Sequence, residues 1–142
     1  MSRARAFLVV LVATLAGCAV HTLPPIETRF GPALFGTWEW RQSTGGIAGR
    51  TETPATRKYR EKLVLEPSGF YQVFRDDSVA VTGRFSIARE ATQFRPDSAY
   101  VIRWDGLLPL HSAIVEMQGA DTLRLTDLCV DCYDHLYVRA KS

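Results

Sequence analysis

From Gly36 onward, apolar and polar residues alternate along short segments that turn residues separate. In the first segment Trp38 and Trp40 fall on one face of an extended chain, and the polar residues beside them fall on the other. Segments rich in β-branched and aromatic residues with a two-residue period are typical of strands. The pattern predicts eight strands, at 36–42, 60–66, 70–75, 79–89, 99–104, 110–118, 122–126 and 135–140.

The connections between these strands are short, apart from one long loop at 43–58. Short connections favour antiparallel pairing of consecutive strands, and no segment has helical periodicity beyond a turn near 32–34. Gly83, inside the fourth strand, predicts a bulge or a sharp bend. We therefore expect an all-β fold, a single antiparallel up-and-down β-barrel of about eight strands, in residues 34–142.

The N-terminus has the pattern of an export signal. Arg3 and Arg5 precede an apolar stretch, 6–15, which is too short to cross a bilayer as a helix. The stretch ends in Leu15-Ala16-Gly17-Cys18, which resembles the lipobox of bacterial lipoproteins. The resemblance implies that the signal peptide, residues 1–17, is removed and that Cys18 is lipidated. Two or more acyl chains on Cys18 would hold the protein stably at a membrane.

Lipidation implies a place in the bacterial cell envelope. An aspartate after the lipidated cysteine often marks inner-membrane retention in Gram-negative lipoproteins, and here Ala19 takes that position. We therefore expect the protein to be anchored in the outer membrane and to face the periplasm. Residues 18–33, which include Pro24-Pro25, predict an extended tether between the membrane and the barrel.

The charge of the chain argues against a nucleic-acid partner. The sequence has 17 basic and 15 acidic residues. Two of the basic residues, Arg3 and Arg5, lie in the signal peptide, which has no acidic residue, so the mature chain carries fifteen of each sign. A neutral chain without a basic patch lacks the electrostatic footprint of a nucleic-acid-binding protein.

Gly36-Thr37-Trp38 resembles the G-x-W signature that opens the first strand of lipocalins. In that family a basic residue from the end of the last strand stacks across the tryptophan, and Arg139 occupies the matching place here. A guanidinium over an indole gains a cation–π contribution of roughly 0.5–2 kcal/mol. The resemblance therefore implies a structural clasp between Trp38 and Arg139.

More closely, the chain from about Leu34 to its C-terminus is similar to small lipocalin-like lipoproteins of bacterial envelopes. The motifs that carry this similarity are short and fall in the same order. They are 36–40, Gly45-Gly46 with Thr53-Pro54, 69–71, 83–87 and 123–139. The departure is Cys132, where that family usually has glycine. Lipocalins in general bind small apolar molecules, whereas the activity of the short envelope members is undefined.

A barrel of about eight strands has an interior that side chains fill or that holds one small ligand. The inward-facing residues are therefore candidates for lining an apolar ligand site, and equally for filling the core. They are Trp40, Leu63, Leu65, Phe85, Ile87, Tyr100, Ile102 and Trp104, with Leu123 and Leu125 on a later strand.

Cys129 and Cys132 allow three interpretations. In an exported chain they favour a short disulfide before the last strand. A redox pair is the second, although no strand-to-helix context is present to lower a thiol pKa. A metal site with His135 is the third, and it would need a fourth ligand such as His111.

No set of nucleophile and base stands out, and neither G-x-S-x-G nor H-E-x-x-H occurs. Asp127, Asp131 and Asp134 cluster in one segment and could attract a cation, but such residues more often make local turn hydrogen bonds. We expect no enzyme activity, cofactor or resident metal. The hypotheses left are a binding module for a small apolar or amphiphilic ligand, a protein-interaction or structural role that uses loop 43–58, and a redox or metal function at the cysteine pair.

Overall fold

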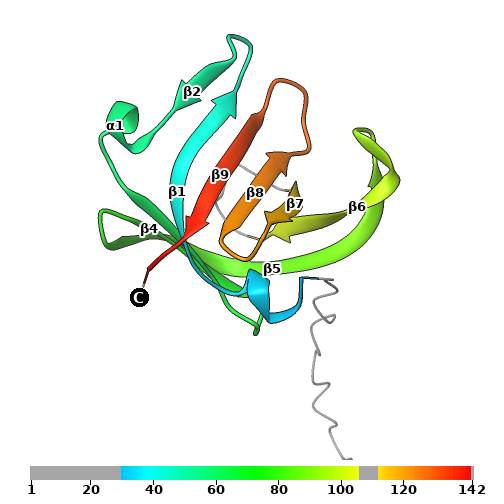
Figure 1. Ribbon diagram of the computed structural model, residues 1–142, viewed down its shortest axis with the longest axis horizontal. Helices are drawn as coiled ribbons and strands as arrows, with labels where there is room; N and C mark the ends of the chain where they lie inside the picture. Colours follow the sequence, from blue (N-terminus) through cyan, green and yellow to red (C-terminus); the bar gives the residue numbers. More distant parts are fainter. Residues whose placement is uncertain (1–29, 106–111, 142) are drawn as a thin grey trace, which may run out of the picture.

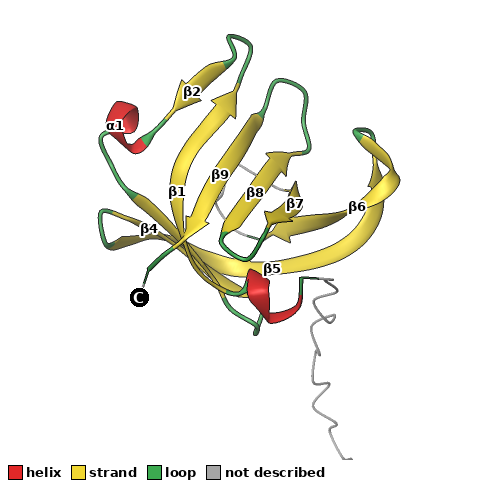
Figure 2. Cartoon of the chain, viewed as in Figure 1, coloured by secondary structure: helices red, strands yellow, loops and turns green. Residues whose placement is uncertain are grey.

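A computed structural model describes residues 30–105 and 112–141. It contains nine antiparallel strands, a 3₁₀ helix at Gly31–Leu34 and a short helix, α1, at Pro54–Arg57 (Figures 1 and 2). The strands are β1 (Gly36–Gly45), β2 (Arg50–Glu52), β3 (Glu61–Leu65), β4 (Phe70–Arg75), β5 (Ser78–Thr92), β6 (Arg95–Trp104), β7 (Ser112–Gln118), β8 (Thr122–Asp127) and β9 (Tyr133–Arg139).

Consecutive strands from β3 to β9 pair with each other, and β1 pairs with β3 on one side and with β9 on the other. The result is a closed barrel of eight strands, with β2 as an additional strand outside the circle. Closure removes the exposed edges that an open sheet of this length would leave. The all-β, up-and-down barrel predicted from the alternation is therefore confirmed, and it is consistent with a lipocalin-like fold.

The core follows the predicted alternation. Trp38 and Trp40 on β1 are buried, whereas Arg41 is exposed. The interior is built from one face of every barrel strand, and its largest fully buried side chains include Trp38, Tyr71, Leu65 and Ile102. Fully burying one such side chain contributes about 1.5–3 kcal/mol, so the core supplies the main stabilising term.

β1 connects three neighbours, and its second half departs from the simple alternation. Its first residues pair with β3, its last residues pair with β2, and β9 runs along its other edge. A register shift between Trp40 and Gln42 places a bulge at Arg41 on the β9 side. Because a bulge inserts one extra residue, the inward face moves by one position. Ser43 is therefore buried although the sequence pattern leaves it in a loop.

The segment expected to be one long loop, 43–58, is structured along most of its length. It holds the end of β1, the strand β2 and the helix α1. Thr53 caps α1 in a capping box with Thr56, and Pro54 takes the first helical position. Lys58 ends the helix in the left-handed conformation, with φ 64°. The prediction of an unstructured loop was wrong because a four-residue helix and a three-residue strand leave no periodicity to detect.

Gly83 serves a different purpose from the predicted bulge. It pairs regularly with Tyr71, and the register shift of β5 falls instead between Val79 and Val81. A Cβ at position 83 would lie 2.5 Å from the carbonyl oxygen of Asp105 and 2.8 Å from the Tyr71 ring. Glycine is required there because the chain after β6 passes directly over the strand.

The packed domain begins before the expected boundary at residue 34. Phe30, assigned to the tether from the sequence, packs against the core, and its ring lies 5.4 Å from that of Tyr100. Several sequence predictions concern residues outside the described ones: the predicted signal peptide, Cys18, the rest of the predicted tether, and the first two residues of the predicted strand 110–118, the second of which is His111. Within 30–105 and 112–141, no helix has the length and hydropathy needed to span a bilayer.

Candidate functional site

The first strand and the last meet in the predicted contact between Trp38 and Arg139. The guanidinium carbon of Arg139 lies 4.2 Å from the centre of the Trp38 ring. Its nitrogens donate to the carbonyl oxygens of Phe35, Ala33 and Ala120. Arg139 thus joins β9 to the N-terminal 3₁₀ segment and to the turn after β7. We call this end of the barrel, where β1 begins and β9 ends, the closed end.

The eight residues proposed from the sequence to line a ligand site come together in the barrel core. Seven of them, Trp40, Leu63, Leu65, Phe85, Ile87, Ile102 and Trp104, are buried, and Tyr100 is partly buried against them. Leu123 and Leu125 are buried in the same cluster. Side chains that line an open cavity keep part of their surface accessible from that cavity. The buried core side chains named above have almost no accessible surface. The core residues therefore fill the described part of the interior.

A buried polar cluster lies at the opposite end, near the last residues of β1. The Ser43 hydroxyl lies 2.6 Å from Nδ1 of His135, and Nε2 of His135 lies 3.3 Å from Oδ2 of Asp127. The indole N–H of Trp40 donates to the Ser43 hydroxyl at 2.8 Å. The order hydroxyl, imidazole, carboxylate is that of an activated nucleophile. Ser43 is only 4% exposed, however, and its hydroxyl is already engaged by Trp40 and His135.

Asp127 is the most constrained member of this cluster. It is 3% exposed, and its Oδ2 also accepts the backbone N–H of Tyr133 at 3.2 Å. Its other oxygen, Oδ1, has no hydrogen-bond partner among the described residues. Buried carboxylate oxygens are normally hydrogen-bonded, so this atom calls for a physical explanation. Sequence reasoning placed Asp127 in an acidic cluster and missed Ser43, because their proximity depends on the bulge at Arg41.

A second polar group lies between β3, β4 and β9. The Tyr137 hydroxyl is 3.5 Å from Glu61, and Glu61 forms an ion pair with Arg75 at 3.0 Å. Burial raises the pKa of Tyr137 well above its usual value, and the nearby negative charge of Glu61 raises it further. Tyr59 stacks against Trp40 with ring centres 5.9 Å apart, beneath the Arg75 guanidinium. These contacts attach the segment after α1 to the barrel.

Cys129 and Cys132 form a disulfide, as favoured from the sequence, with Cα atoms 5.5 Å apart. The disulfide closes the loop 128–132, whose Cys132 carbonyl accepts the N–H of Gly46 at 3.2 Å. A side chain at Gly45 would collide with the Cys132 backbone. Loop 128–132 and the turn 46–49 therefore brace each other, and we call them together the rim loops. The described residues hold no cluster of metal ligands.

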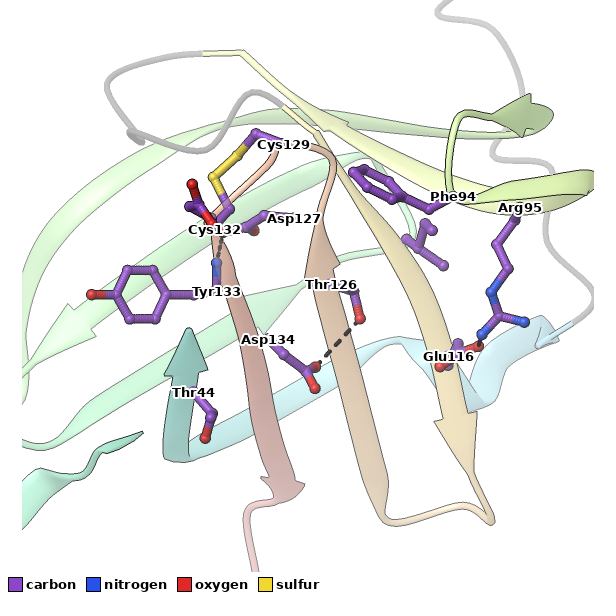
Figure 3. Close-up of a pocket in the computed structure, with 12 residues that line it drawn as sticks. Thr44, Phe94, Arg95, Glu116, Thr126, Asp127, Cys129, Cys132, Tyr133 and Asp134 are labelled. Atoms are coloured by element: carbon purple, nitrogen blue, oxygen red, sulfur yellow. Dashed lines mark hydrogen bonds and ion pairs between the residues drawn. A yellow bond between two sulfur atoms is a disulfide. The ribbon is translucent and has the colours of Figure 1, made fainter. Parts of the chain in front are cut away.

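A surface pocket of about 260 Å³ lies outside the barrel wall, between the disulfide loop and the β5–β6 hairpin (Figure 3). Phe94 and Arg95 come from the hairpin, and Ile114 and Glu116 come from β7. The remaining lining residues come from β1, β8, β9 and the disulfide loop, and include Thr44, Thr126, Asp127, Asp131, Tyr133 and Asp134. We call this the acidic pocket, because it has four carboxylates and one guanidinium.

The rim loops also carry exposed apolar side chains. Ile47, in the turn after β1, is 93% exposed, and Val130, between the two cysteines, is 75% exposed. The other large apolar side chains that are clearly exposed, Phe70, Val79 and Phe94, lie elsewhere. The two most exposed large apolar side chains of the described residues are therefore on two loops that touch each other.

Comparison with known proteins gives no relative for this chain: no protein family model, no curated protein and no solved structure matches it.

Proposed function

We propose that this chain is a membrane-anchored lipoprotein of the bacterial cell envelope, held through Cys18, and that its barrel is a non-catalytic module that binds a protein partner through the rim loops. The N-terminal pattern motivates the anchor and the location. The barrel supplies a rigid scaffold, which suits recognition by loops at one end.

The observation that carries the proposal is the exposure of Ile47 and Val130 on two mutually braced loops. Isolated exposed apolar residues are common on protein surfaces. Here both loops are braced by a disulfide and by backbone hydrogen bonds, so the backbone that carries the two side chains is held in place before any partner arrives. A preorganised loop backbone loses little conformational entropy on binding, which favours affinity.

The place where the described chain enters the barrel supports this role. β1 runs from the closed end at Gly36 to the rim at Gly45, and ten extended residues span about 30 Å. The described chain enters the barrel at the closed end, through Phe30 and the 3₁₀ helix. A tether before Phe30 therefore joins the domain at the end away from the rim loops, and leaves those loops free to meet a partner.

A small apolar or amphiphilic ligand inside the barrel is the second function to consider, and it has less support. The residues proposed to line its site are packed against one another. Such a ligand would have to displace side chains that already contribute to the core. Native mass spectrometry of the purified chain tests this directly, because a small molecule that co-purifies and is released on denaturation would favour the ligand.

Site-specific crosslinking in a bacterial envelope tests the partner. We expect a photoreactive residue at position 47 to give discrete crosslinked products that Val130→Ser reduces, and a photoreactive residue at position 130 to give products that Ile47→Ser reduces. Val79→Ser is the matched control, because Val79 is 53% exposed on β5 and lies on neither rim loop. Crosslinks that are unchanged by these substitutions, or that are absent from both positions, would contradict the proposal.

A further inference from the structure

We propose that the acidic pocket binds a small molecule that carries a protonated amine on an apolar body. The site is separate from the rim apolar residues, so this inference stands whether or not the rim binds a protein. Three features of the pocket support it: its charge, its unsatisfied buried oxygen and its exposed aromatic wall.

The charge of the pocket is unbalanced. Glu116 forms an ion pair with Arg95 at 2.8 Å, and the two carboxylate oxygens of Asp134 share the Nε–H of Arg124 at 2.8 Å. These two carboxylates are therefore compensated. Asp127 and Asp131 line the same pocket, and neither has an arginine or lysine partner among the described residues. The nearest basic group to Asp127 is the His135 imidazole at 3.3 Å, so an incoming cation would meet two carboxylates that no described arginine or lysine compensates.

The buried carboxylate of Asp127 supplies the specific contact. Its Oδ2 is occupied by the Tyr133 N–H and by His135, whereas Oδ1 has no partner in the part of the chain that the structure describes. Leaving a buried acceptor without a donor costs about 1–3 kcal/mol, and more when the acceptor is charged. A ligand ammonium has three donors and a positive charge, so it would satisfy Oδ1 with a charge-assisted hydrogen bond.

The apolar wall explains why the amine should be attached to an apolar body. Phe94 sits at the tip of the β5–β6 hairpin, 44% exposed, and its backbone N–H is fixed by the Thr92 hydroxyl at 3.2 Å. Ile114 lies across from it on β7 and is buried although it is not part of the barrel core. An aromatic face beside a carboxylate suits a cation or the ring next to it.

Benzylamine is a suitable probe, with benzyl alcohol as its neutral analogue and benzoate as its anionic one. Binding is measured by calorimetry and by saturation-transfer NMR on the full-length chain in a non-ionic detergent. We expect saturable binding of benzylamine, at least tenfold weaker binding of benzyl alcohol, and no binding of benzoate. We expect Asp127→Asn to weaken benzylamine binding at least tenfold, and Phe94→Ala to weaken it several-fold.

Asp121→Asn is the matched control, because Asp121 is an exposed carboxylate in the turn before β8 and does not line the pocket. If Asp127→Asn does not fold, Phe94→Ala and Asp131→Asn carry the test, since both side chains are at the surface. Equal binding of benzylamine and benzyl alcohol would overturn the proposal. So would binding that none of the pocket substitutions changes, or the absence of benzylamine binding, which would leave Oδ1 to a water molecule only.

Discussion

Ser43 and His135 are 92 residues apart in the sequence, and their side chains are joined by a 2.6 Å hydrogen bond between the end of β1 and the start of β9. The bond lies inside the seam that closes the barrel. The Ser43 hydroxyl also accepts the indole N–H of Trp40. One buried hydroxyl thus serves the indole of the buried Trp40 and the half-buried imidazole of His135.

We predict that Ser43→Ala lowers the free energy of unfolding by about 1–3 kcal/mol, because the Trp40 N–H loses its acceptor and His135 loses a partner in a buried site. Chemical denaturation followed by tryptophan fluorescence measures the change. Thr44→Ala is the control, since Thr44 is exposed and bonds only to the Thr51 hydroxyl at 3.1 Å, and we expect a loss below about 0.5 kcal/mol there. Equal losses in the two variants would contradict a special role for Ser43.

A second prediction concerns the closed end of the barrel. Arg139→Ala removes the cation over Trp38 and leaves three backbone carbonyls without their donor, so we expect the free energy of unfolding to fall by roughly 2–4 kcal/mol. Arg139→Lys keeps the positive charge but lacks the planar guanidinium with its several donors. It should therefore recover only part of the lost free energy of unfolding. Arg41→Ala, in an exposed pair with Glu39, should change little. Full recovery by lysine would show that charge alone matters.

The disulfide gives a third prediction. A loop this short is expected to stabilise the fold by about 2 kcal/mol through the unfolded chain. Reduction, or the double change Cys129→Ser with Cys132→Ser, should lower the melting temperature and speed hydrogen exchange at Gly46, whose N–H is held by Cys132. Val130→Ser, between the cysteines, is the control and should change neither quantity. Unchanged exchange at Gly46 after reduction would mean that the disulfide does not brace the rim.

A fourth prediction follows from the buried phenol of Tyr137. Its pKa in the folded protein is raised well above 10.0, chiefly by burial and then by the charge of Glu61. An unfolded chain therefore releases this proton at lower pH than the folded one, and stability falls as pH rises above about 10. Below that pH the group makes no pH-dependent contribution.

Denaturation between pH 9 and pH 11 measures this slope. We expect Tyr137→Phe to make the free energy of unfolding less dependent on pH in this range, whereas Tyr133→Phe, which removes a phenol at the rim, serves as the matched control. The same alkaline slope in wild type and Tyr137→Phe would contradict the assignment.

Much of the architecture follows from local pattern. The alternation at Trp38 and Trp40 is a property of neighbouring residues on an extended chain, so the strand and its inward face could be predicted without any tertiary contact. The pairing of Cys129 with Cys132 could be favoured for the same reason, because two residues in one short loop are close in any compact fold. The acidic pocket could not be predicted from local pattern, because Phe94 reaches it from a hairpin that is distant in sequence.

The sequence by itself determined an all-β chain of short antiparallel strands, because side-chain periodicity and turn residues act within a few positions. Only the tertiary structure decided that β9 closes on β1, that a bulge at Arg41 turns Ser43 inward toward His135, and that the proposed ligand-lining residues fill the core. Those outcomes depend on register and packing between segments that are far apart along the chain. A shift of one residue in the register of a strand exchanges its two faces, and no local pattern fixes it.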